Sequence, residues 1–176
     1  EISISYPIRL DAMAINPSAV CYNDSMNFTP GEVVVSANKF IKVYIKVTNK
    51  NDSVEISDST RRKVLVKHAY YLMKKVINFT NGLYIDVDDK DIPKHCGFGS
   101  SSSTISAVAA AINEMFSHPI SNEDLIKYLA SNHGEEIDDN NENDLKMVQC
   151  IGGGATGGLT EAGIIIIAGK STTIAK

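Results

Sequence analysis

The sequence has no excess of basic residues and no apolar run long enough to cross a lipid bilayer. Its 176 residues include 17 Lys and Arg against 21 Asp and Glu, a net charge of −4. Because binding to nucleic acid or to an anionic membrane surface needs positive potential, neither partner is expected. The run Ile164–Ala168 has the length of a strand, whereas a membrane-spanning helix needs about 18 apolar residues. We therefore expect no membrane partner either.

Cysteine is scarce, and its spacing excludes two common uses. Cys21, Cys96 and Cys150 are odd in number and lie far apart. This spacing matches neither a zinc site nor a redox pair, and it gives no disulfide framework. Thiols that stay reduced are typical of the cytoplasm. The sequence therefore predicts a cytoplasmic protein.

Apolar patterns indicate one α+β domain that covers residues 1–176, since a chain of this length buries a single core. Strands are predicted for residues 2–6, 32–37, 39–47, 82–88 and 163–168, where apolar residues alternate or cluster. Helices are predicted for residues 60–79, 104–116 and 121–132, where they recur at helical spacing. Ser57, Asp58 or Ser59 is expected to cap the first of these helices, and the segment 121–124 forms a capping box for the last.

A glycine and serine segment precedes the helix predicted from residue 104. Gly97 and Gly99 flank one residue, and four serines follow at 100–103. Glycines allow a sharp turn, and the N-terminus of a helix favours an anion such as phosphate. Serine hydroxyls add donors to phosphate and ligands for Mg²⁺. The alternative is a glycine turn before a core helix with no ligand.

Two well-known phosphate loops do not fit this segment. A Walker A loop needs a Lys-Ser or Lys-Thr pair after its second glycine, and the dinucleotide fingerprint needs a third glycine. Neither is present. The pattern Pro93-x3-Gly97-Phe98-Gly99-Ser100-Ser101-Ser102 instead resembles the nucleotide-phosphate loop of the GHMP kinase superfamily, which includes galactokinase, homoserine kinase, mevalonate kinase and phosphomevalonate kinase.

This resemblance implies a fold, two cofactors and a set of binding residues. The fold is α+β of the ribosomal protein S5 domain 2-like type with a left-handed βαβ unit, as in the N-terminal domain of GHMP kinases. The cofactors are ATP and Mg²⁺. The residues implied in cofactor binding are Pro93, Gly97, Phe98, Gly99, Ser100, Ser101 and Ser102.

Two further segments are similar to the family. Pro7-Ile8-Arg9 matches its Pro-x-(Lys or Arg) strand, which implies that Arg9 is catalytic and faces the transferred group or the substrate. The alternative for Arg9 is a solvated strand end. The acidic tract 135–144 is either a solvated loop or, as the resemblance implies, the source of a catalytic Asp138 and of Glu142, which would hold the metal together with Ser100.

A second glycine-rich stretch, residues 152–158, is expected to be a loop before the strand at 163–168. The resemblance places a catalytic aspartate among residues 149–156, and this chain has none there. That departure keeps two other functions open. One is a non-kinase enzyme of the same fold, such as a β-ribofuranosylaminobenzene phosphate synthase-like protein or a decarboxylase. The other is a non-catalytic nucleotide-binding domain.

The resemblance covers residues 3–168, the N-terminal half of a usual family member. It implies that the C-terminal substrate domain is absent from this chain and that a further domain or a second chain completes the site; a homodimer is a further option. The function implied is ATP-dependent phosphoryl transfer to a hydroxyl of a small molecule. A sugar, a sugar phosphate or a mevalonate-type acid is the implied acceptor.

Overall fold

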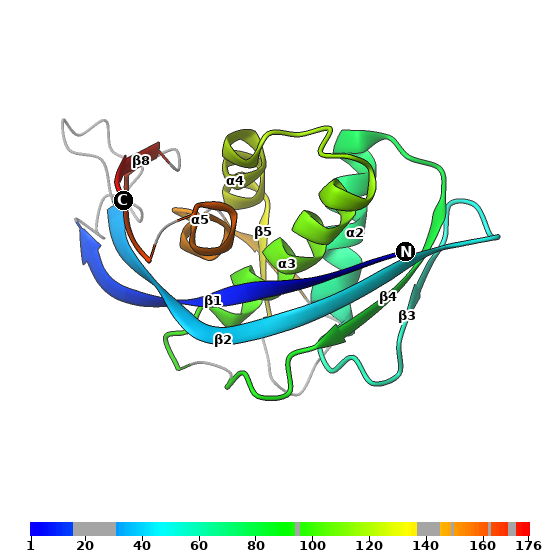
Figure 1. Cartoon of the computed structure of the whole chain (residues 1–176), viewed down its shortest axis with the longest axis horizontal. Coiled ribbons are helices and arrows are strands. Elements are labelled where there is room, and N and C mark those ends of the chain that lie inside the picture. Colours follow the sequence, from blue (N-terminus) through cyan, green and yellow to red (C-terminus); the bar gives the residue numbers. More distant parts are fainter. Residues whose placement is uncertain (16–30, 94–95, 137–144, 149, 162, 169–171) are drawn as a thin grey trace.

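The computed structural model describes residues 1–15, 31–93, 96–136, 145–148, 150–161, 163–168 and 172–176. Helices cover one side of a mixed sheet (Figure 1). The strands of that sheet are β1 (Ile2–Ile15), β2 (Gly31–Thr48), β3 (Val54–Ile56), β4 (Gly82–Asp88), β7 (Ile164–Ala168) and β8 (Thr172–Ala175). The helices are α2 (Lys63–Ile77), α3 (Ser100–Met115), α4 (Asn122–Ser131) and α5 (Gly153–Leu159), and β5 (His133–Glu136) pairs with β6 (Leu145–Val148).

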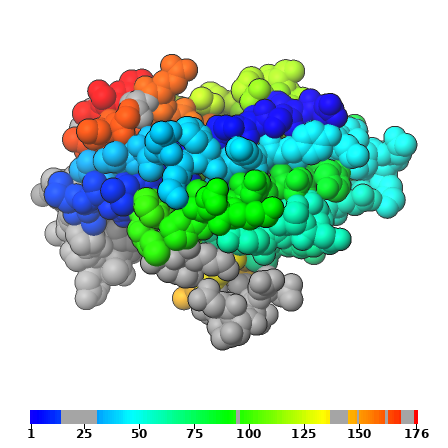
Figure 2. Space-filling model, turned by 60° about the horizontal axis from the view of Figure 1, so that its bottom comes forward, coloured from blue at the N-terminus to red at the C-terminus, as the bar shows by residue number. Residues whose placement is uncertain are grey.

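The long strand β2 organises the sheet. It pairs antiparallel with β1 along both of its halves, with β7 near its start and with β4 toward its end. β3 adds to β4 in parallel, and α2 connects these two strands. The bands of β2, β4 and β3 lie next to one another in Figure 2. Irregularities between Pro7 and Arg9 and between Asp11 and Met13 interrupt the β1–β2 register and bend β1, as bulges do.

The core lies between the sheet and the helices. Ile41, Val43 and Ile45 alternate along β2 and are fully buried, as expected for a strand with one buried face. Helix α3 supplies Ile105, Val108 and Ile112 to the same cluster. Its many alanines let it pack closely against β1 and β2, which brings its N-terminus to the bend in β1.

The helix boundaries follow local hydrogen bonding. Ser121 caps α4 as predicted, because its Oγ accepts the N–H of Asp124 at 3.1 Å. Helix α2 begins at Lys63, three residues later than expected. The hydroxyl of Ser59 donates to Asp86, and that of Thr60 accepts the N–H of Val87. Ser59 and Thr60 therefore hydrogen-bond to β4 and do not cap α2.

Other sequence predictions differ from the structure as well. Residues 32–37 and 39–47 form one continuous strand rather than two. The glycine-rich segment 153–159, expected to be a loop, is helix α5. Glu135 and Glu136, assigned to a solvated or metal-binding tract, lie in strand β5 and bond to other segments. In the described part of the chain, no helix is long and apolar enough to span a membrane.

Candidate functional site

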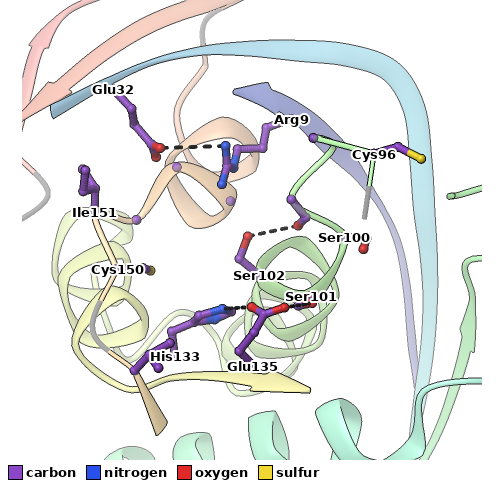
Figure 3. A pocket seen from close by; sticks show the side chains of 16 residues that line it. Arg9, Glu32, Cys96, Ser100, Ser101, Ser102, His133, Glu135, Cys150 and Ile151 are labelled. Carbon is purple, nitrogen blue, oxygen red and sulfur yellow. Dashed lines mark hydrogen bonds and ion pairs between the residues drawn. The ribbon is translucent and has the colours of Figure 1, made fainter. Parts of the chain in front are cut away.

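A cavity of about 350 Å³ opens where α3, α5, β1, β2 and β5 meet (Figure 3). Its walls combine small residues with a few ionisable side chains. The described residues that line it are Arg9, Glu32, Cys96, Gly97, Gly99, Ser100, Ser101, Ser102, His133, Glu135, Val148, Cys150, Ile151, Gly152, Gly153 and Gly154. Both glycine-rich stretches of the sequence therefore reach one cavity, although they lie some fifty residues apart.

The N-terminus of α3 forms one wall. Gly99 precedes the helix in the left-handed conformation, with φ 54°, and no side chain caps the helix there. A side chain on Gly99 would also collide with Arg9. The first N–H groups of a helix have no partner within it and carry the positive end of its dipole. Since Ser100, Ser101 and Ser102 line the cavity, this wall suits an anion.

Arg9 faces the same space from β1. Its Nη1 lies 3.4 Å from Oδ2 of Asp11 and 3.8 Å from Oε2 of Glu32. Both Nε and Nη1 are buried and have no hydrogen-bond partner in the described part of the chain. A buried donor without a partner costs free energy. The guanidinium is therefore arranged to receive an acceptor that enters the cavity.

Glu32 lies across from Arg9 on β2 (Figure 3). It is only 6% exposed, and its Oε1 has no hydrogen-bond partner among the described residues. Burial raises the pKa of the Glu32 carboxyl above its usual value, Arg9 opposes this shift, and Asp11 adds to it. The cavity thus contains a carboxyl that is easier to protonate than an exposed one.

A chain of hydrogen bonds forms the opposite wall. The hydroxyl of Ser101 donates to Oε1 of Glu135 at 2.8 Å, and Oε2 of Glu135 lies 2.8 Å from Nε2 of His133. The hydrogen bond from His133 lowers the pKa of Glu135, against the effect of burial. Arg62, almost fully buried, donates to Ser101 at 2.7 Å and forms an ion pair with Glu136. Strand β5 is thereby attached to the start of α3.

Close packing explains the glycines of α5. A side chain on Gly154 would overlap Ser102 of α3, and one on Gly158 would overlap the ring of Tyr6. The hydroxyl of Tyr6 in turn donates to the carbonyls of Gly154 and Ala155, at 3.1 and 2.9 Å. Helix propensity disfavours glycine, but only residues without a side chain let α5 approach this closely.

The structure brings most of the predicted site residues together. Arg9, Gly97, Gly99 and the three serines 100–102 line the cavity. Phe98 packs against the core instead, and Pro93 is exposed and is not among the lining residues. Asp138 and Glu142 lie outside the described residues.

The sequence does not single out Glu32 or His133, and it places Glu135 only within the acidic tract 135–144. Glu32 stands beside Val33, Val34 and Val35, and a carboxylate in such an apolar strand is a signal because its burial is costly. His133 and Glu135 follow directly after α4. Nothing in their spacing shows that β5 would place them against Ser101.

A family model described as GHMP kinases N terminal domain matches residues 64–144, from the second residue of α2 through β4, α3 and α4. The resemblance to the GHMP kinases is confirmed. No curated protein matches the sequence.

Solved structures share the GHMP kinase fold at low identity. Mevalonate kinase from Methanococcus jannaschii aligns with a TM-score of 0.61 and 15% identity, over 96% of this chain and 54% of that one. L. major mevalonate kinase in complex with R-mevalonate gives 0.63 and 12%, over 96% and 49%. Streptococcus pneumoniae phosphomevalonate kinase in complex with phosphomevalonate and AMPPNP gives 0.55 and 13%, over 74% and 42%.

These likenesses confirm the α+β fold class of the GHMP kinase N-terminal domain. The chain spans about half the length of the structures it matches. The neighbours are kinases of small molecules by their names, and at this identity they establish the fold alone.

Proposed function

We propose that this chain is the nucleotide-binding part of a kinase that transfers the γ-phosphoryl group of ATP to a hydroxyl of a small molecule. The observation that carries the proposal is the uncapped start of α3, which faces Arg9 across one cavity. The Nε and Nη1 atoms of this guanidinium make no hydrogen bond within the described residues. Phosphoryl transfer needs mainly positioning and stabilisation of negative charge. Helix N–H groups and an arginine supply both.

In this proposal the backbone from Gly97 to Ser102 holds the phosphates of ATP. The left-handed Gly99 aims the first amides of α3 at them, and the hydroxyl of Ser100 adds a donor at the cavity wall. Arg9 neutralises the charge of the group being transferred. The phosphomevalonate kinase neighbour was solved with AMPPNP, an analogue of ATP, which is consistent with this assignment.

The cavity also fits Mg²⁺, which would supply further charge neutralisation. Among the described residues, no three carboxylate, imidazole or thiol groups are placed to hold a metal. Mg²⁺ typically takes only one or two carboxylates and completes its shell with phosphates and water. Glu135, whose lowered pKa keeps it ionised at neutral pH, and the Ser101 hydroxyl 2.8 Å away are suitable donors. We therefore add Glu135 to the predicted ligands Ser100 and Glu142.

The acceptor site is proposed to be shared with residues beyond this chain. The neighbours are about twice as long, so a C-terminal domain, a second chain or a homodimer would complete it. A sugar, a sugar phosphate or a mevalonate-type acid is the proposed acceptor, and the cytoplasm the proposed compartment. Arg9 would pair with an anionic group of such an acceptor or with the transferred phosphoryl group.

The test is ADP release from ATP and Mg²⁺ by this chain together with the domain or partner that completes the acceptor site, in the presence of mevalonate, phosphomevalonate, homoserine and a panel of sugars. At least one acceptor is expected to stimulate release. Arg9→Ala should lower the stimulated rate at least tenfold, while Lys42→Ala, which removes an exposed cation from the same sheet, should leave it unchanged. Equal rates in the two variants would contradict the role of Arg9.

A non-kinase function is the second candidate, because residues 149–156 contain no acidic side chain. A non-kinase enzyme of this fold, such as a β-ribofuranosylaminobenzene phosphate synthase-like protein, or a non-catalytic nucleotide-binding domain would bind a phosphorylated ligand without releasing ADP. Thermal stabilisation by AMPPNP with Mg²⁺, together with no ADP release from any acceptor, would favour this candidate.

A further inference from the structure

One carboxyl in the cavity, that of Glu32, has an oxygen that makes no hydrogen bond in the described part of the chain. Glu32 is the second residue of β2, and its side chain is 8% exposed. Its Oε2 lies 3.8 Å from Nη1 of Arg9, and its Oε1 has no hydrogen-bond partner in the described part of the chain. A buried oxygen without a partner indicates a group that is completed by a ligand.

The other ionisable groups on the described cavity wall are less available. Glu135 is the carboxylate proposed to hold Mg²⁺, and its two oxygens also contact Ser101 and His133. That contact also occupies the Nε2 atom of His133. Burial raises the pKa of the Cys150 thiol to about 11, so the thiol is protonated at neutral pH. Glu32 is therefore the carboxylate best placed to accept a proton from a bound molecule.

The packing of α5 fixes the position of the Glu32 carboxylate. Gly153 is the first residue of α5, and the Glu32 carboxylate fills the space that a side chain at this position would need. The same point lies 3.0 Å from Nε of Arg9. The second glycine-rich stretch thus provides no carboxylate of its own, and β2 supplies one in its place beside the guanidinium.

We infer that Glu32 is the catalytic base that removes the proton from the acceptor hydroxyl, an inference that rests on the proposed kinase function. The hydroxyl oxygen forms a bond to the γ-phosphorus of ATP, and the bond from that phosphorus to the β–γ bridging oxygen breaks. ADP leaves with the electron pair of the broken bond. The hydroxyl proton moves to the Glu32 carboxylate, and Arg9 stabilises the charge on the transferred group.

The surroundings of Glu32 suit proton acceptance. Arg9 and the backbone N–H of Gly153 favour its ionised form, whereas burial and Asp11 favour its neutral form. Cys150 is also close enough to be affected by its charge, and that thiol is neutral. Burial outweighs the other effects and raises the Glu32 pKa. A general base works best when its pKa lies near the working pH.

The inference is tested with Glu32→Gln and Glu32→Asp. Glu55→Gln is the matched control, because Glu55 is an exposed carboxylate on β3. Affinity for AMPPNP with Mg²⁺ is measured by calorimetry, and ADP release is measured with the acceptor panel and with water alone as acceptor. Glu32→Gln is expected to bind AMPPNP within about threefold of wild type and to lose roughly 100-fold or more in ADP release. Glu32→Asp should retain an intermediate rate, and the control should match wild type.

The pH profile separates catalysis from a structural role. Wild-type ADP release should fall as the pH drops through the pKa of Glu32, and the residual rate of Glu32→Gln should lack this fall. Unchanged ADP release in Glu32→Gln, or the same pH profile in both proteins, would overturn the inference and leave the kinase proposal standing. Loss of AMPPNP binding in Glu32→Gln would overturn it in favour of a structural role. No ADP release from wild type with any acceptor or with water, measured together with the domain or partner that completes the acceptor site, would overturn both proposals.

Discussion

The guanidinium of Arg9 lies against Gly99, with Nε 2.7 Å from the point where a side chain on that glycine would begin. A strand from the start of the chain and the turn before α3 are therefore in direct contact. This contact is available only to glycine, both for space and because Gly99 has φ 54°.

Gly99→Val is expected to abolish nucleotide binding without unfolding the chain. A branched side chain in the left-handed region costs about 1–2 kcal/mol. The side chain would also displace Arg9 and block access to the N-terminus of α3. Thermal stabilisation by AMPPNP with Mg²⁺ should therefore disappear. Gly163→Val is the control, because nothing lies within 4 Å of its added Cβ. Persistence of the full stabilisation in Gly99→Val would show that the nucleotide does not bind at this turn.

Replacement of Glu136 by Gln should destabilise the fold strongly. The side chains of Arg62 and Glu136 are 2% and 9% exposed, and removing one partner of a buried ion pair typically costs roughly 3–5 kcal/mol. Urea denaturation measures the change. Glu123→Gln is the control, since its exposed pair with Lys127 should be worth less than about 1 kcal/mol. Similar losses in the two variants would contradict the structural role of Arg62.

Glu135 should make stability depend on pH in the acidic range. The hydrogen bond from His133 holds its pKa below the usual value of 4.5 in the folded protein. A lowered folded pKa contributes stability above the unfolded pKa, and this contribution is lost as the pH falls through the folded pKa. The difference in melting temperature between wild type and Glu135→Gln should shrink as the pH is lowered from 6 toward 3. A difference that is constant with pH would exclude this contribution.

Gly158→Ala should also destabilise the protein, because the added methyl group would overlap the ring of Tyr6. Overpacking of a core typically costs about 1–3 kcal/mol, and displacement of Tyr6 would break its hydrogen bonds to Gly154 and Ala155. Chemical denaturation measures the loss, with Gly163→Ala as the control. A neutral effect would mean that α5 does not pack as closely on β1 as the structure has it.

Local signals in the sequence were sufficient for several elements. Strand β4, strand β7 and the cap of α4 at Ser121 were predicted because apolar alternation and side-chain capping are short-range effects. The same holds for the turn at Gly97 and Gly99, where two glycines precede a serine-rich helix start.

The remaining elements depend on contacts between distant segments. Helix α5 forms despite the low helix propensity of glycine, and its glycines at 154 and 158 let it pack directly against Ser102 and Tyr6. β2 continues through Ser36 and Ala37 because β1 pairs with it on both sides of this point. The meeting of Arg9 with Glu32 likewise results from the pairing of β1 and β2, and no local pattern encodes it.

The most direct test of the account is a crystal structure of the protein with AMPPNP and Mg²⁺. Phosphate oxygens are expected within hydrogen-bond distance of the backbone amides at the start of α3, between Gly99 and Ser102, with Arg9 beside the γ-phosphate. A nucleotide bound elsewhere, or phosphates that do not contact this helix start, would contradict it.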